Sequence, residues 1–224
     1  MSRRSLSPDG ITPELMLRAY SIGVFPMAES AHDPWLHWIE PRQRGIIPLH
    51  GLHISRSLAK TIRADLFDIR INYDFPRMIE SCATARETTW ISQRLRSLYI
   101  DLHEQGFAHS VEAWSDGELA GGLFGIALGG AFFGESMFHK KRDASKIALA
   151  HLVARLIKGN FRLLDTQFIT PHLQSLGAVE IDRSTYLVHL DKALEIDADF
   201  FAFDETSTHE GRDILAILAT EETD

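Results

Sequence analysis

The sequence predicts a mixed α/β fold in which a small N-terminal unit precedes a larger domain with a central mixed sheet. Three observations favour this class. Residues 1–50 are rich in Pro, Trp and His, whereas a regular pattern begins at Leu52. Residues 108–138 contain three apolar segments separated by turn residues. A long helical stripe and further short apolar segments follow them. The predicted domains are therefore residues 1–50 and 51–224.

Helix and strand boundaries predict the elements of the first half. We expect a helix over residues 13–21, because Pro13 suits a first turn whose N–H groups have no partner in the helix. The segment Gly23-Val24-Phe25-Pro26 ends this helix. The following pattern predicts a helix at 55–64, a strand at 67–72, a helix at 75–85, and a helix that carries Leu95, Leu98, Tyr99 and Leu102 and stops at Gly106.

An antiparallel meander opens the second half, with strands at 108–114, 119–128 and 131–138. Asp143 is expected to cap the next helix and Gly159 to end it. The remaining elements are a strand at 161–168, a helix at 171–176, a strand at 178–181 and a helix at 184–193, with none assigned beyond Asp199. The acetyltransferase-type (GNAT-like) fold has this order of elements.

Composition excludes several classes of protein. The chain is 45% hydrophobic and 24% charged, as is usual for a globular protein. Its single cysteine, Cys82, excludes an internal disulfide and a cysteine-rich zinc site. No apolar segment follows the basic N-terminus, and the longest uncharged stretch, 119–134, is shorter than the ~20 apolar residues of a membrane span. The sequence therefore predicts a cytoplasmic protein.

The net charge of −8 is concentrated near the C-terminus. Of the 31 acidic residues, 11 lie within residues 191–224, beside 2 basic ones, which leaves 20 acidic and 21 basic residues elsewhere. Basic residues cluster at 41–64 and at 139–162. Each cluster is interpreted either as a solvated helix face or as a surface that contacts the phosphates of a nucleic acid.

Several catalytic motifs are absent. The sequence contains neither a phosphate-binding loop nor a Gly-x-Gly-x-x-Gly motif. Ser136 lacks the second glycine of a nucleophile elbow, and His50 and His53 have no neighbouring carboxylate to complete a metal site. We therefore expect no cofactor and no metal, and an enzyme built on this chain needs a substrate that arrives already activated.

Two apolar strand segments each contain an acid. Alternation places Leu163, Asp165 and Gln167 on one face of the first segment. Glu135 interrupts the second segment, 132–138. A carboxylate in such a place is costly without a partner, so the acids belong either to a structural hydrogen-bond network or to an electronegative site for an ammonium group. A tryptophan beside a basic cluster is able to stack a nucleotide base, and the chain has Trp35, Trp38, Trp90 and Trp114.

A series of short motifs occurs in a fixed order between residues 10 and 190. They are Gly23-Val24-Phe25-Pro26, Thr89-Trp90-Ile91, His109-Ser110-Val111-Glu112, Gly121-Gly122-Leu123-Phe124-Gly125, Phe133-Gly134-Glu135-Ser136-Met137-Phe138, Ala144-Ser145-Lys146, Asp165-Thr166-Gln167 and Ser175-Leu176-Gly177-Ala178. In this series the chain resembles the leucyl/phenylalanyl-tRNA–protein transferases. The resemblance implies a GNAT-like domain behind a small N-terminal domain. It also implies that Leu or Phe is moved from aminoacyl-tRNA to proteins beginning with Arg or Lys, which marks those proteins for degradation.

The resemblance also implies roles for individual residues. Asp165 and Gln167 match the catalytic pair, and Glu135 matches an acid near the acceptor. Trp90 matches a tryptophan that contacts the terminal adenosine, whereas Met27 stands where some relatives carry another. The other substrate-binding positions are Trp38, from a pair that reads His37-Trp38 here, and the side-chain pocket Leu123, Phe132 and Met137. We expect phosphate contacts from Arg42, Arg44, Arg56, Lys60, Lys140, Lys141 and Arg142.

An aminoacyl ester is an activated acyl donor, so the implied reaction needs neither ATP nor a metal. In our hypothesis Asp165 orients Gln167, Gln167 contacts the acceptor amine, and Glu135 binds the cationic N-terminal residue. The 2′-hydroxyl of the terminal adenosine relays the proton. The hydrophobic pocket admits some Met, since such pockets discriminate by only ~1–3 kcal/mol per methylene. Substitution of Asp165 or Gln167 is expected to lower turnover with folding unchanged.

Two alternative functions remain. An acyl-CoA-dependent N-acetyltransferase needs a Gly-rich pyrophosphate loop at the start of a helix, and the helix after Asp143 opens without one. A non-catalytic binder of basic N-termini accounts for Glu135 and Asp165, but it leaves the basic clusters and Trp90 unexplained.

Overall fold

The computed structural model describes residues 4–6, 10–203 and 210–220, so the first three residues and parts of the acidic C-terminal segment lie outside the described residues. A small antiparallel sheet contains β1 (Arg4–Leu6), β2 (Phe25–Met27) and β3 (Leu36–Ile39). A larger mixed sheet contains β4 (Gln43–Ile46), β5 (Asp68–Ile71), β6 (Ala108–Ser115), β7 (Glu118–Leu128), β8 (Ala131–His139), β9 (Leu163–Gln167) and β10 (Val179–Asp182).

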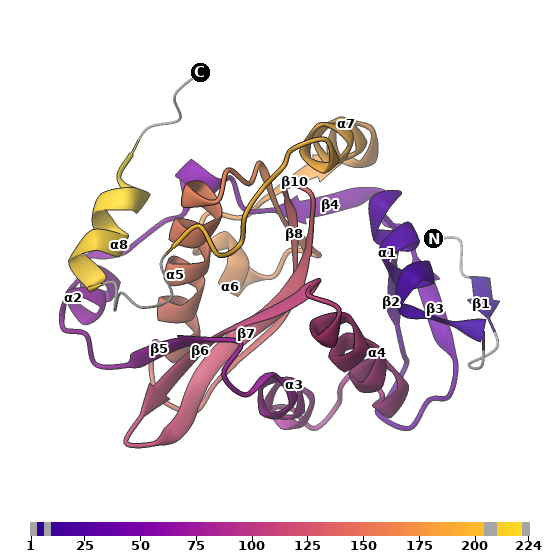
Figure 1. The fold of residues 1–224 in the computed structure, drawn as a ribbon, viewed down its shortest axis with the longest axis horizontal. Coiled ribbons are helices and arrows are strands. Elements are labelled where there is room, and N and C mark those ends of the chain that lie inside the picture. The colour runs from indigo at the N-terminus through magenta and orange to yellow at the C-terminus, as the bar shows by residue number, and fades with distance from the viewer. Residues whose placement is uncertain (1–3, 7–9, 204–209, 221–224) are drawn as a thin grey trace.

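The strand orders are β1-β3-β2 and β10-β4-β9-β8-β7-β6-β5 (Figure 1). This arrangement confirms the predicted mixed α/β class, and its likeness to the GNAT-like fold stays a prediction. The division after residue 50 also stays a prediction. β4 precedes that boundary in the sequence, yet it pairs with β9 and β10 in the large sheet.

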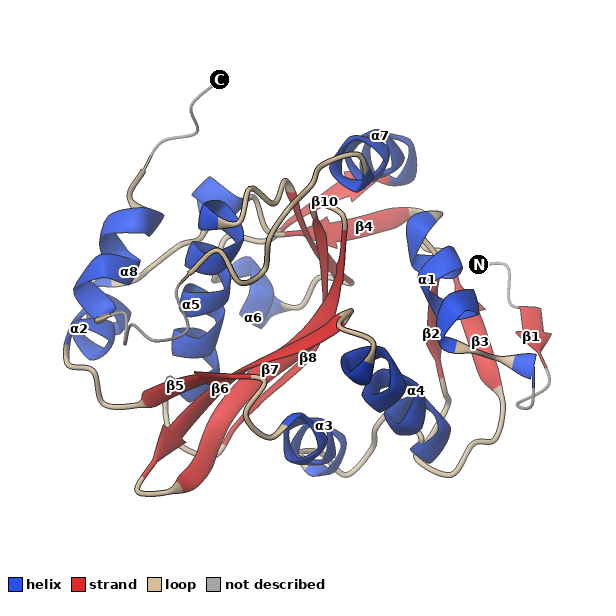
Figure 2. Cartoon of the chain, viewed as in Figure 1, coloured by secondary structure: helices blue, strands red, loops and turns tan. Residues whose placement is uncertain are grey.

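Helices cover both faces of the large sheet (Figure 2). The first face packs against α3 (Phe75–Thr84) and α4 (Gln93–Glu104). On the second face lies α5 (Ala144–Lys158), flanked by α2 (Arg56–Arg63) and α8 (Gly211–Leu218). The remaining helices are α1 (Pro13–Ser21), the 3-10 helix Leu49–Gly51, α6 (Pro171–Gln174) and α7 (Arg183–Leu194). Within the described residues, no helix is both long enough and apolar enough to cross a membrane.

Local sequence explains most helix starts. The Thr12 hydroxyl accepts a hydrogen bond from the backbone N–H of Leu15, and Pro13 occupies the first turn of α1, as predicted. Asp143 occupies the N-cap position of α5, as predicted, but its side chain makes no capping hydrogen bond. Its backbone is left-handed, with φ of 65°, and its carboxylate lies 3.5 Å from the side-chain nitrogens of Arg142 and Lys146 instead of capping α5. Side chains cap helices from an extended backbone, and the left-handed backbone of Asp143 departs from that geometry.

The large sheet is irregular around Glu135. Phe124 pairs with Ser136 and Gly125 pairs with Gly134, so Glu135 is the extra residue of a β-bulge in β8. Parallel pairing of β8 with β9 extends only to Phe133 and Asp165. β9 itself is irregular against β4, because Thr166 is skipped between its two paired neighbours. The irregularities of both strands fall where their mutual pairing ends.

Candidate active site

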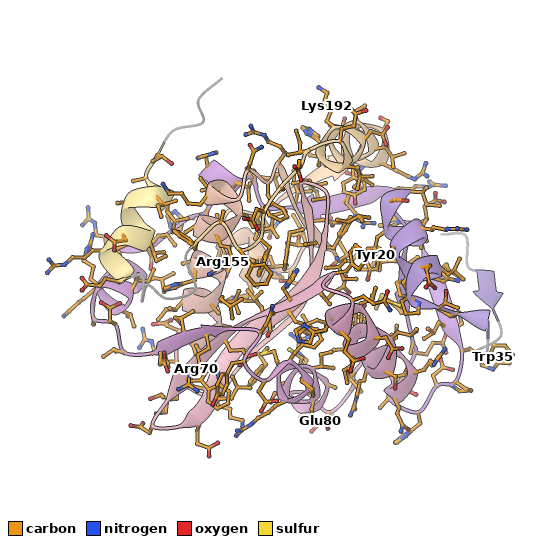
Figure 3. The ribbon with its side chains drawn as sticks, viewed as in Figure 1. Tyr20, Trp35, Arg70, Glu80, Arg155 and Lys192 are labelled. Atoms are coloured by element: carbon orange, nitrogen blue, oxygen red, sulfur yellow. The ribbon has the colours of Figure 1, made fainter. Side chains whose placement is uncertain are left out.

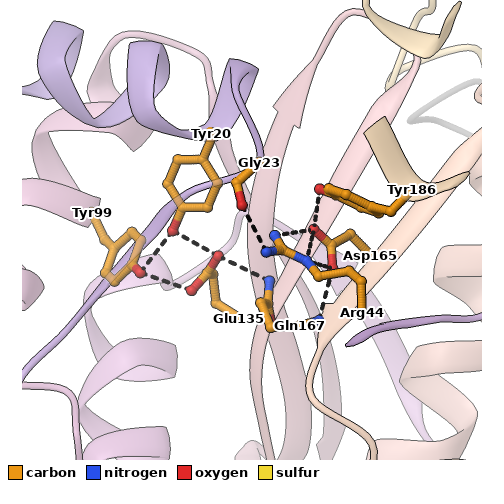
Figure 4. Close-up of polar contacts among 8 residues, drawn as sticks. All are labelled: Tyr20, Gly23, Arg44, Tyr99, Glu135, Asp165, Gln167 and Tyr186. Carbon is orange, nitrogen blue, oxygen red and sulfur yellow. Dashed lines mark hydrogen bonds and ion pairs between the residues drawn. The ribbon is translucent and has the colours of Figure 1, made fainter. Parts of the chain in front are cut away.

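Asp165 lies at the centre of a buried polar network (Figure 4). Arg44 of β4 donates from Nε to Oδ1 at 2.9 Å and from Nη2 to Oδ2 at 2.6 Å. The Tyr186 hydroxyl of α7 donates to Oδ2 and the backbone N–H of Gln167 donates to Oδ1, both at 2.7 Å. Each carboxylate oxygen therefore accepts two short hydrogen bonds. These bonds offset the desolvation free energy of a charged group on a central strand.

The prediction that Arg44 contacts a phosphate is wrong, because this residue is only 1% exposed. Its guanidinium lies between the rings of Phe25 and Tyr186, 4.6 and 4.5 Å from their centroids, and donates to the carbonyl of Gly23 at 2.8 Å. Burial acts to lower the pKa of Arg44, but the Asp165 carboxylate outweighs it and the net direction is upward. Arg44 stays charged and links β2 and the turn before it to β9.

Gln167 ends β9 in a left-handed conformation with φ of 57°. This turn folds its backbone N–H onto the Asp165 carboxylate and sends its amide Nε2 to within 3.5 Å of Glu135 Oε1. Simple strand alternation placed Asp165 and Gln167 on one face, and the structure brings them together through a tighter local turn.

Glu135 is reached by two tyrosines from separate helices. The Tyr20 hydroxyl of α1 donates to Oε1 and the Tyr99 hydroxyl of α4 donates to Oε2, both at 2.8 Å. Burial raises the pKa of Glu135 to about 7, against the lowering effect of these two hydrogen bonds. Within the described part of the chain, no cationic side chain forms an ion pair with Glu135, whereas Asp165 is neutralised by Arg44. The electronegative hollow predicted from two acids therefore depends on Glu135.

The predicted pocket residues share one face of the sheet. Phe132 and Met137 are an odd number of positions apart, yet the bulge at Glu135 returns both to the α5 side, with Leu123 directly opposite Met137. Phe132 is fully buried and stacks on Phe200, with centroids 5.7 Å apart.

The predicted adenosine contacts differ in their distance from the network. Trp90 is half-buried in the segment before α4 and meets the Tyr99 ring edge to face, with centroids 6.4 Å apart. Trp38 lies on β3 of the small sheet, where it pairs with Pro26, and within the part of the chain that the structure describes no hydrogen bond or ring contact joins it to Glu135 or Asp165. Trp35, at the outer end of the small sheet, is 47% exposed (Figure 3).

The other predicted phosphate contacts lie on the surface. Arg56 and Lys60 project from α2, and the remaining exposed members are Arg42, Lys140, Lys141 and Arg142. Lys141 forms an ion pair with Asp116 at 2.8 Å. These basic residues occupy separate elements, so their common role stays a prediction.

Sequence reasoning missed Tyr20, Tyr99 and Tyr186 as members of the site. All three are almost completely buried and satisfied the apolar pattern of their helices. The periodicity of a helix reports that a tyrosine ring is buried, but it carries no information about what the hydroxyl contacts.

Two further features of the described residues lie outside this network. Ligand atoms of Glu29, Asp33 and His37 lie within 4.8 Å of one another, but Asp33 already accepts the backbone N–H groups of Glu29 and Trp35 and so holds its own loop. A hollow of about 790 Å³ lies between α2, β5, α5 and α8 and includes none of the predicted site residues.

Comparison with known proteins identifies one family that matches most of the chain. Residues 46–191 match the leucyl/phenylalanyl-tRNA protein transferase family, and residues 9–42 match the N-terminal domain of that family. The chain is 56% identical over 221 residues to such a transferase from Afipia carboxidovorans, with 97% of each chain covered. It is 54% identical over 222 residues to one from Nitrobacter winogradskyi, with 98% of each covered. It is also 54% identical over 220 residues to one from Rhodopseudomonas palustris strain TIE-1, with 97% of this chain and 98% of that one covered.

Proposed function

The chain belongs to the leucyl/phenylalanyl-tRNA protein transferase family, and we propose that it transfers Leu or Phe, and more weakly Met, to acceptor proteins that begin with Arg or Lys. As a member of this family it is an aminoacyltransferase that takes its amino acid from aminoacyl-tRNA and delivers it to proteins. The proposal includes a cytoplasmic location and degradation as the fate of the tagged proteins. The two alternative functions, an acyl-CoA enzyme and a passive binder, are less favoured.

The observation that carries the proposal is the meeting of Glu135 with Gln167 where β8 and β9 separate. The half-buried carboxylate of Glu135, which has no cationic partner among the described residues, attracts the positive N-terminus of the acceptor. The adjacent amide of Gln167, held in place by its own turn and by Asp165, provides an oxygen that accepts from the attacking amine. Because the ester is already activated, positioning the amine against its carbonyl lowers the barrier by up to ~7–11 kcal/mol.

The test is direct transfer of label. Purified protein is incubated with tRNA charged with labelled leucine and a peptide that begins with Arg, beside the same peptide acetylated at its N-terminus. We expect label on the free peptide alone. No transfer to peptides beginning with Arg or Lys, with the charged tRNA still intact, would overturn the proposal, and acyl-CoA donors would be tested next.

For binding of the tRNA body we propose the exposed residues Arg56 and Lys60, which lie one helical turn apart on α2. Replacing both by Glu is expected to weaken tRNA binding and to reduce the slope of log Kd against log salt by about two, since each lost cation removes about one phosphate contact. Lys192→Glu, on α7 (Figure 3), is the matched surface control. Equal salt slopes for the double variant and the control would show that Arg56 and Lys60 contact no phosphate and belong to a solvated helix face.

For the amino-acid pocket we propose Leu123, Phe132 and Met137, and Met137 is the position to change. Truncating the fully buried Phe132 lowers the free energy of unfolding by about 3–5 kcal/mol. A change in specificity could then not be separated from the loss of stability. Met137→Ala is expected to widen the pocket and shift the Phe-to-Leu transfer ratio by about tenfold toward Phe. The control is Leu17→Ala on α1, a half-buried residue outside this cluster. Identical ratios in both variants, measured with a mixture of the two charged tRNAs, would exclude Met137 from the pocket.

A further inference from the structure

Glu135, Tyr20 and Tyr99 form a triangle of oxygen atoms. Each tyrosine oxygen lies 2.8 Å from one carboxylate oxygen, and the two tyrosine oxygens lie 3.1 Å from each other. Each hydroxyl carries one hydrogen, so an ionised Glu135 leaves only two hydrogens for three close contacts. Both rings are fully buried, which excludes water as the usual partner of a phenol.

One added proton completes this triangle. A protonated Glu135 donates from Oε2 to the Tyr99 oxygen, Tyr99 donates to Tyr20, and Tyr20 donates to Oε1 of Glu135. All three short contacts are then hydrogen bonds arranged in one ring. The cluster is therefore built to hold a proton on Glu135 without moving any heavy atom.

Asp165 has no free position for an added proton. Its two oxygens already accept from Arg44, Tyr186 and the Gln167 backbone, which together fill the lone-pair directions of a carboxylate. A proton on Asp165 would displace a donor and leave the buried Arg44 charge without its counterion. Of the two acids, only Glu135 has free capacity, because its Oε2 contacts Tyr99 alone while its Oε1 contacts Tyr20 and Gln167.

We propose that Glu135 is the base that takes a proton from the α-ammonium group of the acceptor, with Tyr20 and Tyr99 as positioning residues for that proton. This proposal rests on the proposed transfer to a protein N-terminus. The ammonium gives one proton to Glu135, and the freed amine attacks the ester carbonyl. The C–N bond forms, the bond from the carbonyl carbon to the 3′-oxygen breaks, and the second proton of the amine passes to that 3′-oxygen. Glu135 then releases its proton to solvent.

The electrostatic surroundings agree with this role. Burial raises the pKa of Glu135 to about 7, Tyr20 on α1 and Tyr99 on α4 lower it, Asp165 on β9 raises it, and Arg44 on β4 lowers it. Burial also raises the pKa of both tyrosines well above the usual range, so they stay protonated donors at neutral pH. A peptide α-ammonium has a pKa of ~8, which a carboxylate that titrates near neutrality matches well.

The experiment is a pH profile of kcat/KM for the acceptor peptide, corrected for spontaneous hydrolysis of the charged tRNA. It compares the unmodified protein with Glu135→Gln, Tyr99→Phe and Tyr186→Phe. Tyr186→Phe is the matched control, because it removes an equally buried hydroxyl that contacts Asp165 instead of Glu135. The amino group of the donor titrates equally in every sample, so only differences between variants are interpreted.

We expect activity of the unmodified protein to rise with pH through about 7, because Glu135 must be ionised to act as a base. Glu135→Gln should lower kcat/KM at pH 7 by about a hundredfold and recover above the acceptor's own pKa of ~8. Tyr99→Phe should move the rising part of the pH profile, the limb, to higher pH, because the hydroxyl that lowers the pKa of Glu135 is lost. Tyr186→Phe should leave this limb in place.

A Glu135→Gln variant that raises only KM, with an unmoved limb, would overturn the proposal and leave Glu135 as a binding group. Carbon-13 NMR of the Glu135 carboxyl gives the same decision without a variant, since a midpoint far below 7 excludes the role. Absence of transfer by the unmodified protein would instead contradict the proposed function.

Discussion

Replacement of Arg44 by methionine is expected to lower the free energy of unfolding by about 3–5 kcal/mol and to abolish aminoacyl transfer. The variant leaves the Asp165 carboxylate, which is 0% exposed, without its counterion, while methionine keeps much of the arginine volume between Phe25 and Tyr186. Urea unfolding measures the first effect, and transfer of labelled leucine to an Arg peptide measures the second.

The double variant Arg44→Met with Asp165→Asn is the matched control. It removes both charges together, so we expect it to regain most of the lost stability while transfer stays lost. Asp165→Asn alone should be destabilised like the Arg44 variant, because it strands the guanidinium. The sequence-based prediction that substitution of Asp165 leaves folding unchanged is therefore revised, because the structure shows a buried ion pair between Asp165 and Arg44. Equal stability of all four proteins would show that the pair is not buried as described.

Gln167→Ala is expected to lower turnover by about tenfold or more, with a change in unfolding free energy of about 1 kcal/mol or less. The backbone N–H of residue 167 continues to bind Asp165 in this variant, so only the amide is tested. That amide makes one long contact, 3.5 Å to Glu135, and its loss costs little stability.

Gln167→Asn separates the amide's chemistry from its position. Asparagine adopts the left-handed conformation of this residue readily and keeps an amide, but its side chain is one methylene shorter. We expect the same loss of turnover with unaltered stability, measured under saturating charged tRNA and peptide. Near-normal turnover of the Ala variant would remove Gln167 from contact with the amine.

Several features of the fold follow from local sequence alone. Thr12 and Pro13 start α1 because capping and proline geometry act within one turn. The turn at Asp116 and Gly117 and the three apolar segments predict the β6–β7–β8 meander, since hairpin geometry depends on neighbouring residues. No pattern predicted α8 or the entry of β4 between β9 and β10, because both depend on packing against distant elements.

The features of the candidate site also fall into those that local sequence determines and those that depend on tertiary packing. The sequence by itself determined that Asp165, Gln167 and Glu135 interrupt apolar strands, which selects them as candidates. Only the tertiary structure decided that Arg44 is the buried partner of Asp165, 121 positions away, and that Tyr20 and Tyr99 converge on Glu135 from 115 and 36 positions away. Periodicity reports which face of an element a side chain occupies. The partner of a buried charge is selected by the desolvation cost it must offset, and that cost exists only once the elements have packed together.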